Sequence, residues 1–194
     1  MMIIEGPSVT TNSDGKISRA ITGTNITTYA YSGNTTTVTL FDAGTFSNKR
    51  IVTLNAAGLA TNIRTENNTA GTDWLNDAFE YDGEEIRRAT HTASTGGSPT
   101  ITTYTWANHN LISETLGSTT TTYDYYTDKP RQNGDFLSLL QLIGGYELYR
   151  NKNLLKSFNG IIFTYNFGTD GNISSAELTS GSSVSFIDYQ YQCN

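Results

Sequence analysis

The stretch GTDWLNDAFEYDGEE, residues 71–85, gathers acidic side chains whose types and spacing could do chemistry. Asp73, Asp77 and Glu80 lie close to Trp74, one of only two tryptophans in the chain. A glycosidase uses two carboxyl groups several ångström apart, and an aromatic ring can form the platform for the sugar. These residues are therefore candidates for a polysaccharide-acting hydrolase, provided that two of the acids face one cleft. The same composition also fits a loop between two strands without any catalytic role.

Other catalytic signals are missing from the sequence. The chain contains no phosphate loop and no GxGxxG, GxSxG, HExxH or CxxC motif. Its two histidines, His91 and His109, would have to lie on neighbouring strands to bind a metal together, whereas isolated strand or turn histidines need no ligand. We therefore expect no catalytic residue, no metal and no cofactor, and a protein that is not an enzyme.

Composition favours strands and excludes some partners. Only 15% of the 194 residues are charged, so the surface is built largely from neutral Thr, Ser, Asn and Gly, and β-branched Thr and the 12 tyrosines suit a pleated sheet. The net charge of −6 argues against nucleic acid. A single cysteine, Cys193, allows no disulfide within the chain, and no apolar run is long enough for a transmembrane helix. The length fits one domain, residues 1–194.

Repeated hairpins organise the chain. Segments that begin with a turn residue followed by Ile or Leu recur, and most are followed downstream by an aromatic-x-aromatic ending such as TYAY, TYTW or TYDY. Each unit is typical of a β-hairpin in which residues two apart share a face. We expect about 12 short strands in sequence order, because alternating apolar runs separated by Gly- and Asn-rich turns predict antiparallel hairpins.

An insert at residues 131–152 holds the only clear helical pattern. Phe136, Leu139, Leu140 and Ile143 follow helical spacing, Asp135 or Asn133 can cap the start, and two glycines follow. This helix, at about 135–143, is apolar nearly all round and so must be enclosed. We therefore predict a mainly β fold: a long antiparallel meander of hairpins that forms a strongly curled sheet or partly open barrel, with the apolar helix packed on its concave side.

The hairpin pattern resembles known repeat proteins. The segments FEYDGEEIRRATH and TYDYYTDKP resemble the tyrosine-aspartate (YD) repeats of Rhs-type bacterial surface proteins. The chain as a whole is similar to a family of secreted or lipoprotein-like Bacteroidetes proteins of unknown function, with a porin-like β fold and a Leu-rich segment like 137–143, followed by a stretch like 151–154. This resemblance implies a periplasmic or cell-surface location. It transfers no catalytic residue, and we expect no lipoprotein signal of the kind typical of that family within residues 1–194.

Aromatic rows are the best candidates for a binding site. Flat rings at strand spacing could stack on a glycan or a peptide, or they could pack around the helix as core. The candidate binding residues are Tyr104, Trp106, Trp74 and Tyr123, and Tyr29 and Tyr165 belong to the same rows. The sequence thus predicts a non-enzymatic surface or periplasmic module that binds a glycan or an envelope protein, or that serves as a scaffold. The hydrolase is the alternative, and the oligomeric state stays open.

Overall fold

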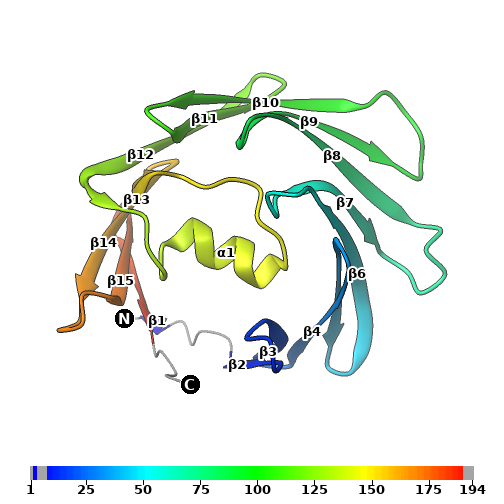
Figure 1. Cartoon of the computed structure of the whole chain (residues 1–194), viewed down its shortest axis with the longest axis horizontal. Coiled ribbons are helices and arrows are strands. Elements are labelled where there is room, and N and C mark those ends of the chain that lie inside the picture. Colours follow the sequence, from blue (N-terminus) through cyan, green and yellow to red (C-terminus); the bar gives the residue numbers. More distant parts are fainter. Residues whose placement is uncertain (1, 4–7, 190–194) are drawn as a thin grey trace.

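One β-sheet contains almost all the regular structure of the chain (Figure 1). The structure is a computed structural model that describes residues 2–3 and 8–189, so Cys193 lies outside the described part. The described elements are β1 (Met2–Ile3), β2 (Ser8–Thr11), β3 (Ile17–Thr22), β4 (Asn25–Ser32), β5 (Thr35–Asp42), β6 (Thr45–Leu54), β7 (Ala60–Glu66), β8 (Trp74–Asp82), β9 (Glu85–Ala93), β10 (Thr100–Ala107), β11 (Asn110–Leu116), β12 (Thr119–Pro130), α1 (Phe136–Gly144), β13 (Asn153–Phe158), β14 (Ile161–Phe167), β15 (Ile173–Ser180) and β16 (Ser183–Asp188).

The sheet is a meander. Each strand from β2 to β15 pairs antiparallel with the next, and β1 pairs parallel with β16. The predicted mainly β chain, an antiparallel meander with one short helix, is confirmed, although the sheet has 16 strands where about 12 were expected from the pattern. The ladder does not close into a barrel, because β1 and β2 stand at its two ends and no ladder joins them in the described residues. Within the same residues, no helix is long and apolar enough to span a membrane.

Tight turns set the strand register. Two-residue turns join β4 to β5 and β11 to β12, and their first residues, Gly33 and Gly117, have φ of 57° and 60°. Glycine adopts this left-handed conformation without the steric cost that a Cβ atom brings, and the resulting turn matches the twist of the paired strands. Register then decides which side chains share a face, since successive residues of a strand point to opposite sides.

Helix α1 begins and ends near its predicted bounds. Asp135 is the N-cap, and its Oδ1 accepts a hydrogen bond from the backbone N–H of Ser138 at 3.1 Å. Gly145, with φ of 77°, ends the helix in the left-handed conformation. The expectation that the helix is enclosed all round is wrong, because Leu140 and Leu142 are 50% and 57% exposed. The polar Gln141 is buried instead, and its side chain carries backbone hydrogen bonds that a leucine could not make.

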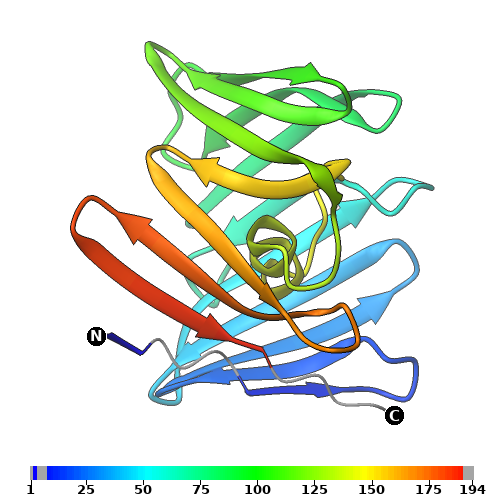
Figure 2. The same ribbon diagram turned by 90° about the vertical axis from the view of Figure 1, so that its left-hand side faces the viewer.

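The helix lies on one face of the sheet, which we call the helix face. Strands from both halves of the sheet contact it: the hydroxyl of Tyr29 on β4 donates to the carbonyl of Ile143 at 2.6 Å, and the backbone N–H of Leu155 on β13 donates to Asp135 at 3.0 Å. Figure 1 shows α1 between the strands β3 to β7 and the strands β13 to β15, and Figure 2 shows it end-on behind the last strands. The apolar core fills the space between α1 and this face.

The segment that follows the helix covers one end of the strands. Arg150 donates to the carbonyl of Ala57 at 2.8 Å and pairs with Glu84 at 3.3 Å, and the N–H of Lys152 donates to the carbonyl of His109 at 3.0 Å. These three partners lie in the β6–β7, β8–β9 and β10–β11 turns, which an antiparallel meander brings to the same end of the sheet. The insert at 131–152 therefore blocks that end of the helix face.

Candidate functional site

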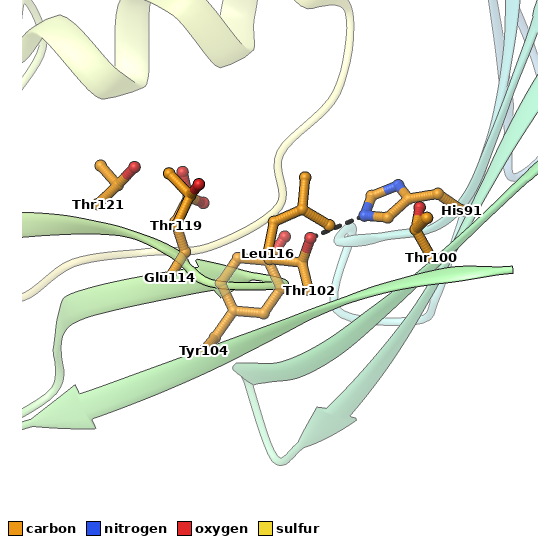
Figure 3. A pocket seen from close by; sticks show the side chains of 8 residues that line it. All are labelled: His91, Thr100, Thr102, Tyr104, Glu114, Leu116, Thr119 and Thr121. Carbon is orange, nitrogen blue, oxygen red and sulfur yellow. Dashed lines mark hydrogen bonds between the residues drawn. The ribbon is translucent and has the colours of Figure 1, made fainter.

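A pocket of about 450 Å³ lies on the helix face, toward the strand ends opposite the insert (Figure 3). Its volume is within the range of about 300–1,000 Å³ that is typical of small-molecule sites. The lining side chains form two rows across β10, β11 and β12, Tyr104–Glu114–Thr121 and Thr102–Leu116–Thr119, with Thr100 and His91 beside the second row. The pocket thus presents four threonine hydroxyls, one aromatic ring, one carboxylate and one imidazole.

A chain of hydrogen bonds fixes one wall of this pocket. His91 Nδ1 lies 2.6 Å from Oδ1 of Asp77, and its Nε2 lies 2.8 Å from Oγ1 of Thr102. An ionised carboxylate only accepts hydrogen bonds, so in the neutral imidazole the proton is on Nδ1 and Nε2 accepts the hydroxyl proton of Thr102. The three side chains come from the adjacent strands β8, β9 and β10. The wall is therefore held in one orientation, with the imidazole and the hydroxyl facing the pocket.

Glu114 lies among tyrosine hydroxyls in the row Tyr104–Glu114–Thr121, which is farther from the open end of the pocket and which we call the deeper row. Its register partners are Tyr104 on β10 and Thr121 on β12, and all three point to the helix face. Burial raises the pKa of Tyr104, and the negative charge of Glu114 raises it further. Burial also raises the pKa of Tyr123, with smaller contributions that include a hydrogen bond to the Glu114 side chain. These phenols therefore stay protonated at neutral pH and present O–H groups around the carboxylate.

The acids proposed for a hydrolase do not meet in one cleft. Asp77 points to the helix face and bonds to His91, whereas Glu80 points to the opposite face and pairs with Arg88 at 2.9 Å. Asp73 precedes β8, where its Oδ1 lies 3.5 Å from the hydroxyl of Ser94. The odd spacing of Asp77 and Glu80 places them on opposite faces of one strand, which leaves no room for a sugar between them.

The predicted aromatic residues divide between structural positions and the pocket. Trp106 donates its indole N–H to the carbonyl of Ile86 at 2.8 Å and packs edge-on against Tyr149, and Tyr123 is buried against the ring of Phe158. Trp74 lies on the opposite face of the sheet, where the guanidinium of Arg64 stacks 4.7 Å from its ring centre. Of the four candidates, Tyr104 is the residue that lines the pocket in the described structure.

The other two aromatic residues of the rows are also buried. The hydroxyl of Tyr29 holds the end of α1, and the ring of Tyr165 stacks on Phe163 with ring centres 6.5 Å apart. Tyr81, from a similar aromatic-x-aromatic ending, donates to the carbonyl of Ala60 at 2.7 Å. Aromatic endings in this chain thus place rings in the core, and Tyr29, Tyr81 and Trp106 direct their polar tips to backbone carbonyls of other segments, as buried Tyr and Trp generally require.

Sequence reasoning missed most of the pocket. Thr102, Thr119 and Glu114 sit in strands that look like ordinary Thr-rich repeats, and nothing in their spacing distinguishes them. One sequence signal could have identified Glu114. It is the single acidic residue of β11, and it occupies an inward-facing position of the alternating pattern at which other strands carry apolar or aromatic residues. In the described residues, no group of three His, Cys, Asp or Glu side chains could hold a metal ion.

Fold and site together define a mainly β protein with a small, threonine-lined pocket on the face that carries its helix. The chain shares its fold with a porin-like protein from Bacteroides uniformis of known crystal structure, with a TM-score of 0.60 over 93% of this chain and 85% of that chain. The two sequences are 15% identical, so the similarity shows the fold alone. No protein-family model matches the chain, and no curated protein matches it.

Proposed function

We propose that the chain is a non-enzymatic binding protein that takes a small polar ligand, a saccharide, in the pocket on its helix face. The observation that carries this proposal is the lining itself. Hydroxyls of Thr102, Thr119 and Thr121 are placed at fixed strand spacing beside the ring of Tyr104 and the carboxylate of Glu114. Apolar surface with a few placed polar groups is the usual composition of a small-molecule site, and sugars combine apolar faces with many hydroxyls.

The surroundings of the pocket support binding rather than passage through the sheet. The insert at 131–152 contacts the turns at the other end of the strands, so the helix face is blocked there. Contacts of α1 with β4 and β13 support the finer proposal that the sheet is strongly curled, with the helix on its concave side. A ligand would then enter the pocket from the end that the 94–99 and 117–118 turns surround.

The proposal also covers the cellular location of the protein and the family to which it is related. We infer a periplasmic or cell-surface protein related to the secreted Bacteroidetes family named above, and the fold shared with the porin-like protein supports this placement. Its ligand would then be a glycan of the surroundings or of the envelope. The partly exposed aromatic ring of Tyr104 at the pocket agrees with a glycan more than with a purely structural module.

Glycan-array screening followed by calorimetric titration tests the proposed function. Thr119→Tyr places a ring in the pocket and is expected to abolish binding, because Thr119 points to the helix face. Thr120→Tyr is the matched control, since the next residue points to the opposite face and its hydroxyl contacts Thr115 there at 3.0 Å. If Thr119→Tyr and wild type bind with equal affinity, the ligand does not bind in this pocket. If no glycan binds, the remaining proposal is that the protein serves as a scaffold.

One observation favours a second function. The chain Thr102–His91–Asp77 has the order of hydroxyl, imidazole and carboxylate that makes a hydroxyl nucleophilic in hydrolases. A fluorophosphonate probe and peptide mass spectrometry test this alternative. Covalent labelling of Thr102 that disappears in His91→Ala would establish an acyl-transfer site in place of a binding site, and an unlabelled wild-type chain would exclude it.

A further inference from the structure

We propose that the pocket selects a saccharide that carries a protonated amine, with the amine bound at Glu114. This inference rests on the proposed saccharide-binding function and names its substrate class. Glu114 is the only carboxylate among the residues that line the pocket, and it lies in the middle of the deeper row, between Tyr104 and Thr121. A ligand that fills the pocket therefore meets this charge.

The charge of Glu114 is not neutralised by a basic side chain. Glu66 pairs with Lys49 at 2.6 Å and Glu147 pairs with Arg131 at 2.8 Å, but in the described part of the chain Glu114 forms no ion pair with Lys or Arg. No Lys or Arg lines the pocket either. The field inside the pocket is thus negative, and the net charge of −6 adds to it.

His91 does not supply a compensating charge at this position. Its Nδ1 faces Asp77, so a proton gained by the imidazole would be balanced by that carboxylate. Titratable groups that face Glu114 from the packed elements are the phenols of Tyr104, Tyr123 and Tyr149, whose pKa values burial raises. These groups are neutral O–H donors, so none of them brings a positive charge to the carboxylate.

Glu114 has capacity for a further donor. A carboxylate offers about four lone-pair sites, which is more than the neighbouring phenols of Tyr104 and Tyr123 could fill with one O–H each. An ammonium group can therefore donate to the remaining sites, and a hydrogen bond between two charged groups is about twice as strong as a neutral one. Because Glu114 is only partly buried, it reaches the ligand without a large rearrangement of its own.

The other lining residues favour a sugar over a lysine-containing peptide. Thr102 on β10 offers a hydroxyl on one side of Leu116, and Thr119 and Thr121 on β12 offer hydroxyls on the other side of Leu116 and Glu114, which suits a ring with several hydroxyl groups. A bound peptide needs partners for its backbone N–H and C=O groups. The backbone groups of β11, the middle strand of the pocket, are instead paired with β10 on one side and with β12 on the other, so a peptide laid over this strand would find side chains alone.

Calorimetric titration compares two oligomers of equal length, the tetramer of glucosamine and the tetramer of N-acetylglucosamine. They differ at the amino group, which is a protonated amine in the first and an uncharged acetamide in the second. We expect the wild-type chain to bind the glucosamine tetramer at least about tenfold more tightly at low salt, as one charge-assisted contact implies. The preference is expected to shrink at high salt, where the ionic atmosphere screens the attraction.

Variants assign the preference to one residue. Glu114→Gln is expected to bring the two affinities together, and Glu114→Asp to reduce the preference without removing it. Asp124→Asn is the matched control: it removes the same charge from the same region, but Asp124 is exposed on the opposite face, where it accepts from Ser157 at 3.0 Å. This control is expected to keep the wild-type preference, and circular dichroism confirms that each variant is folded.

Each outcome decides between the proposals. Equal binding of both tetramers by the wild type overturns the amine preference and leaves saccharide binding intact. A preference that survives in Glu114→Gln overturns the assignment to Glu114. A tri-lysine peptide that binds as tightly as the glucosamine tetramer shows selection by charge alone and overturns the sugar class. If neither tetramer nor any glycan binds, the proposed function itself fails.

Discussion

At the scale of single residues, Asp135 joins the helix to the sheet. One carboxylate oxygen accepts from Ser138 N–H at the start of α1, and the other accepts from Leu155 N–H on β13 at 3.0 Å. The side chain is almost fully buried, at 2% exposure. Burial raises the pKa of Asp135, while the two backbone hydrogen bonds and Arg131 oppose the rise.

The raised pKa makes the contribution of Asp135 depend on pH. Because the folded chain holds this proton more tightly than the unfolded chain, the associated stabilisation is full below the unfolded pKa of about 3.9 and is lost as the pH rises through the folded pKa. We therefore expect the free energy of unfolding of wild type, relative to Asp135→Asn, to fall over this window. Urea denaturation at a series of pH values measures it. A difference between the two proteins that is independent of pH would contradict the argument.

The two tryptophans are expected to differ in their effect on stability. Trp106→Ala removes a half-buried ring and its hydrogen bond to Ile86, and should lower the free energy of unfolding by about 3 kcal/mol. Trp74→Ala removes a ring that stacks on Arg64 at the opposite face, and should cost about 1 kcal/mol. Urea denaturation of both variants checks this order, and equal losses would show that Trp106 is not part of the core.

At the scale of elements, hydrogen-bond partners rather than hydrophobicity decide which residue of α1 is buried. Gln141 is buried at 7% exposure and bonds to the backbone of Leu148 and Tyr149, whereas Leu142 next to it is exposed. Gln141 thereby satisfies backbone groups of the irregular segment that follows the helix, which has no ladder of its own.

Exchanging the polar and the apolar side chain at positions 141 and 142 tests whether hydrogen bonds or hydrophobicity decide which residue of α1 is buried. Gln141→Leu leaves buried backbone groups without partners and is expected to cost about 2–4 kcal/mol, although it makes the helix more apolar. Leu142→Gln is the matched control and should change the free energy of unfolding by less than about 0.5 kcal/mol, because the position is exposed. Thermal or urea denaturation compares them. A stable Gln141→Leu chain would mean that water replaces the lost hydrogen bonds.

Sequence periodicity predicted where the strands and the helix lie, but it did not predict which of their side chains are buried. Alternation and Gly-containing turns correctly indicated hairpins, and helical spacing with Asp135 and Gly145 located α1 to within a residue. The faces of α1 could not be predicted, because the partners of Gln141 come from a segment whose path depends on the whole sheet. The pocket was missed for a similar reason: Thr102 and Glu114 come together only through the register of β10 with β11.

At the scale of the whole molecule, the N-terminal strands contact both ends of the sheet. Met2–Ile3 pairs with Ser185–Phe186 on β16, while Ser8–Thr11 pairs with β3. Deletion of residues 1–7 is expected to expose the outer edge of β16 and to speed amide exchange in residues 183–188, with β8 and β9 unchanged. Hydrogen-exchange mass spectrometry measures both regions. Unchanged protection of residues 183–188 would show that β1 does not stabilise β16.

The pairing of β1 with β16 also orders the events of folding. Hairpins of adjacent strands involve local contacts and form early, whereas contacts between distant residues form slowly. Residues 2–3 leave the ribosome long before residues 183–188, so this ladder must wait until synthesis of the last strands is finished. Until then the nascent sheet carries a growing, unpaired strand edge, which is the kind of edge that recruits other chains. Aggregation through this edge is therefore a hazard during the synthesis of the protein.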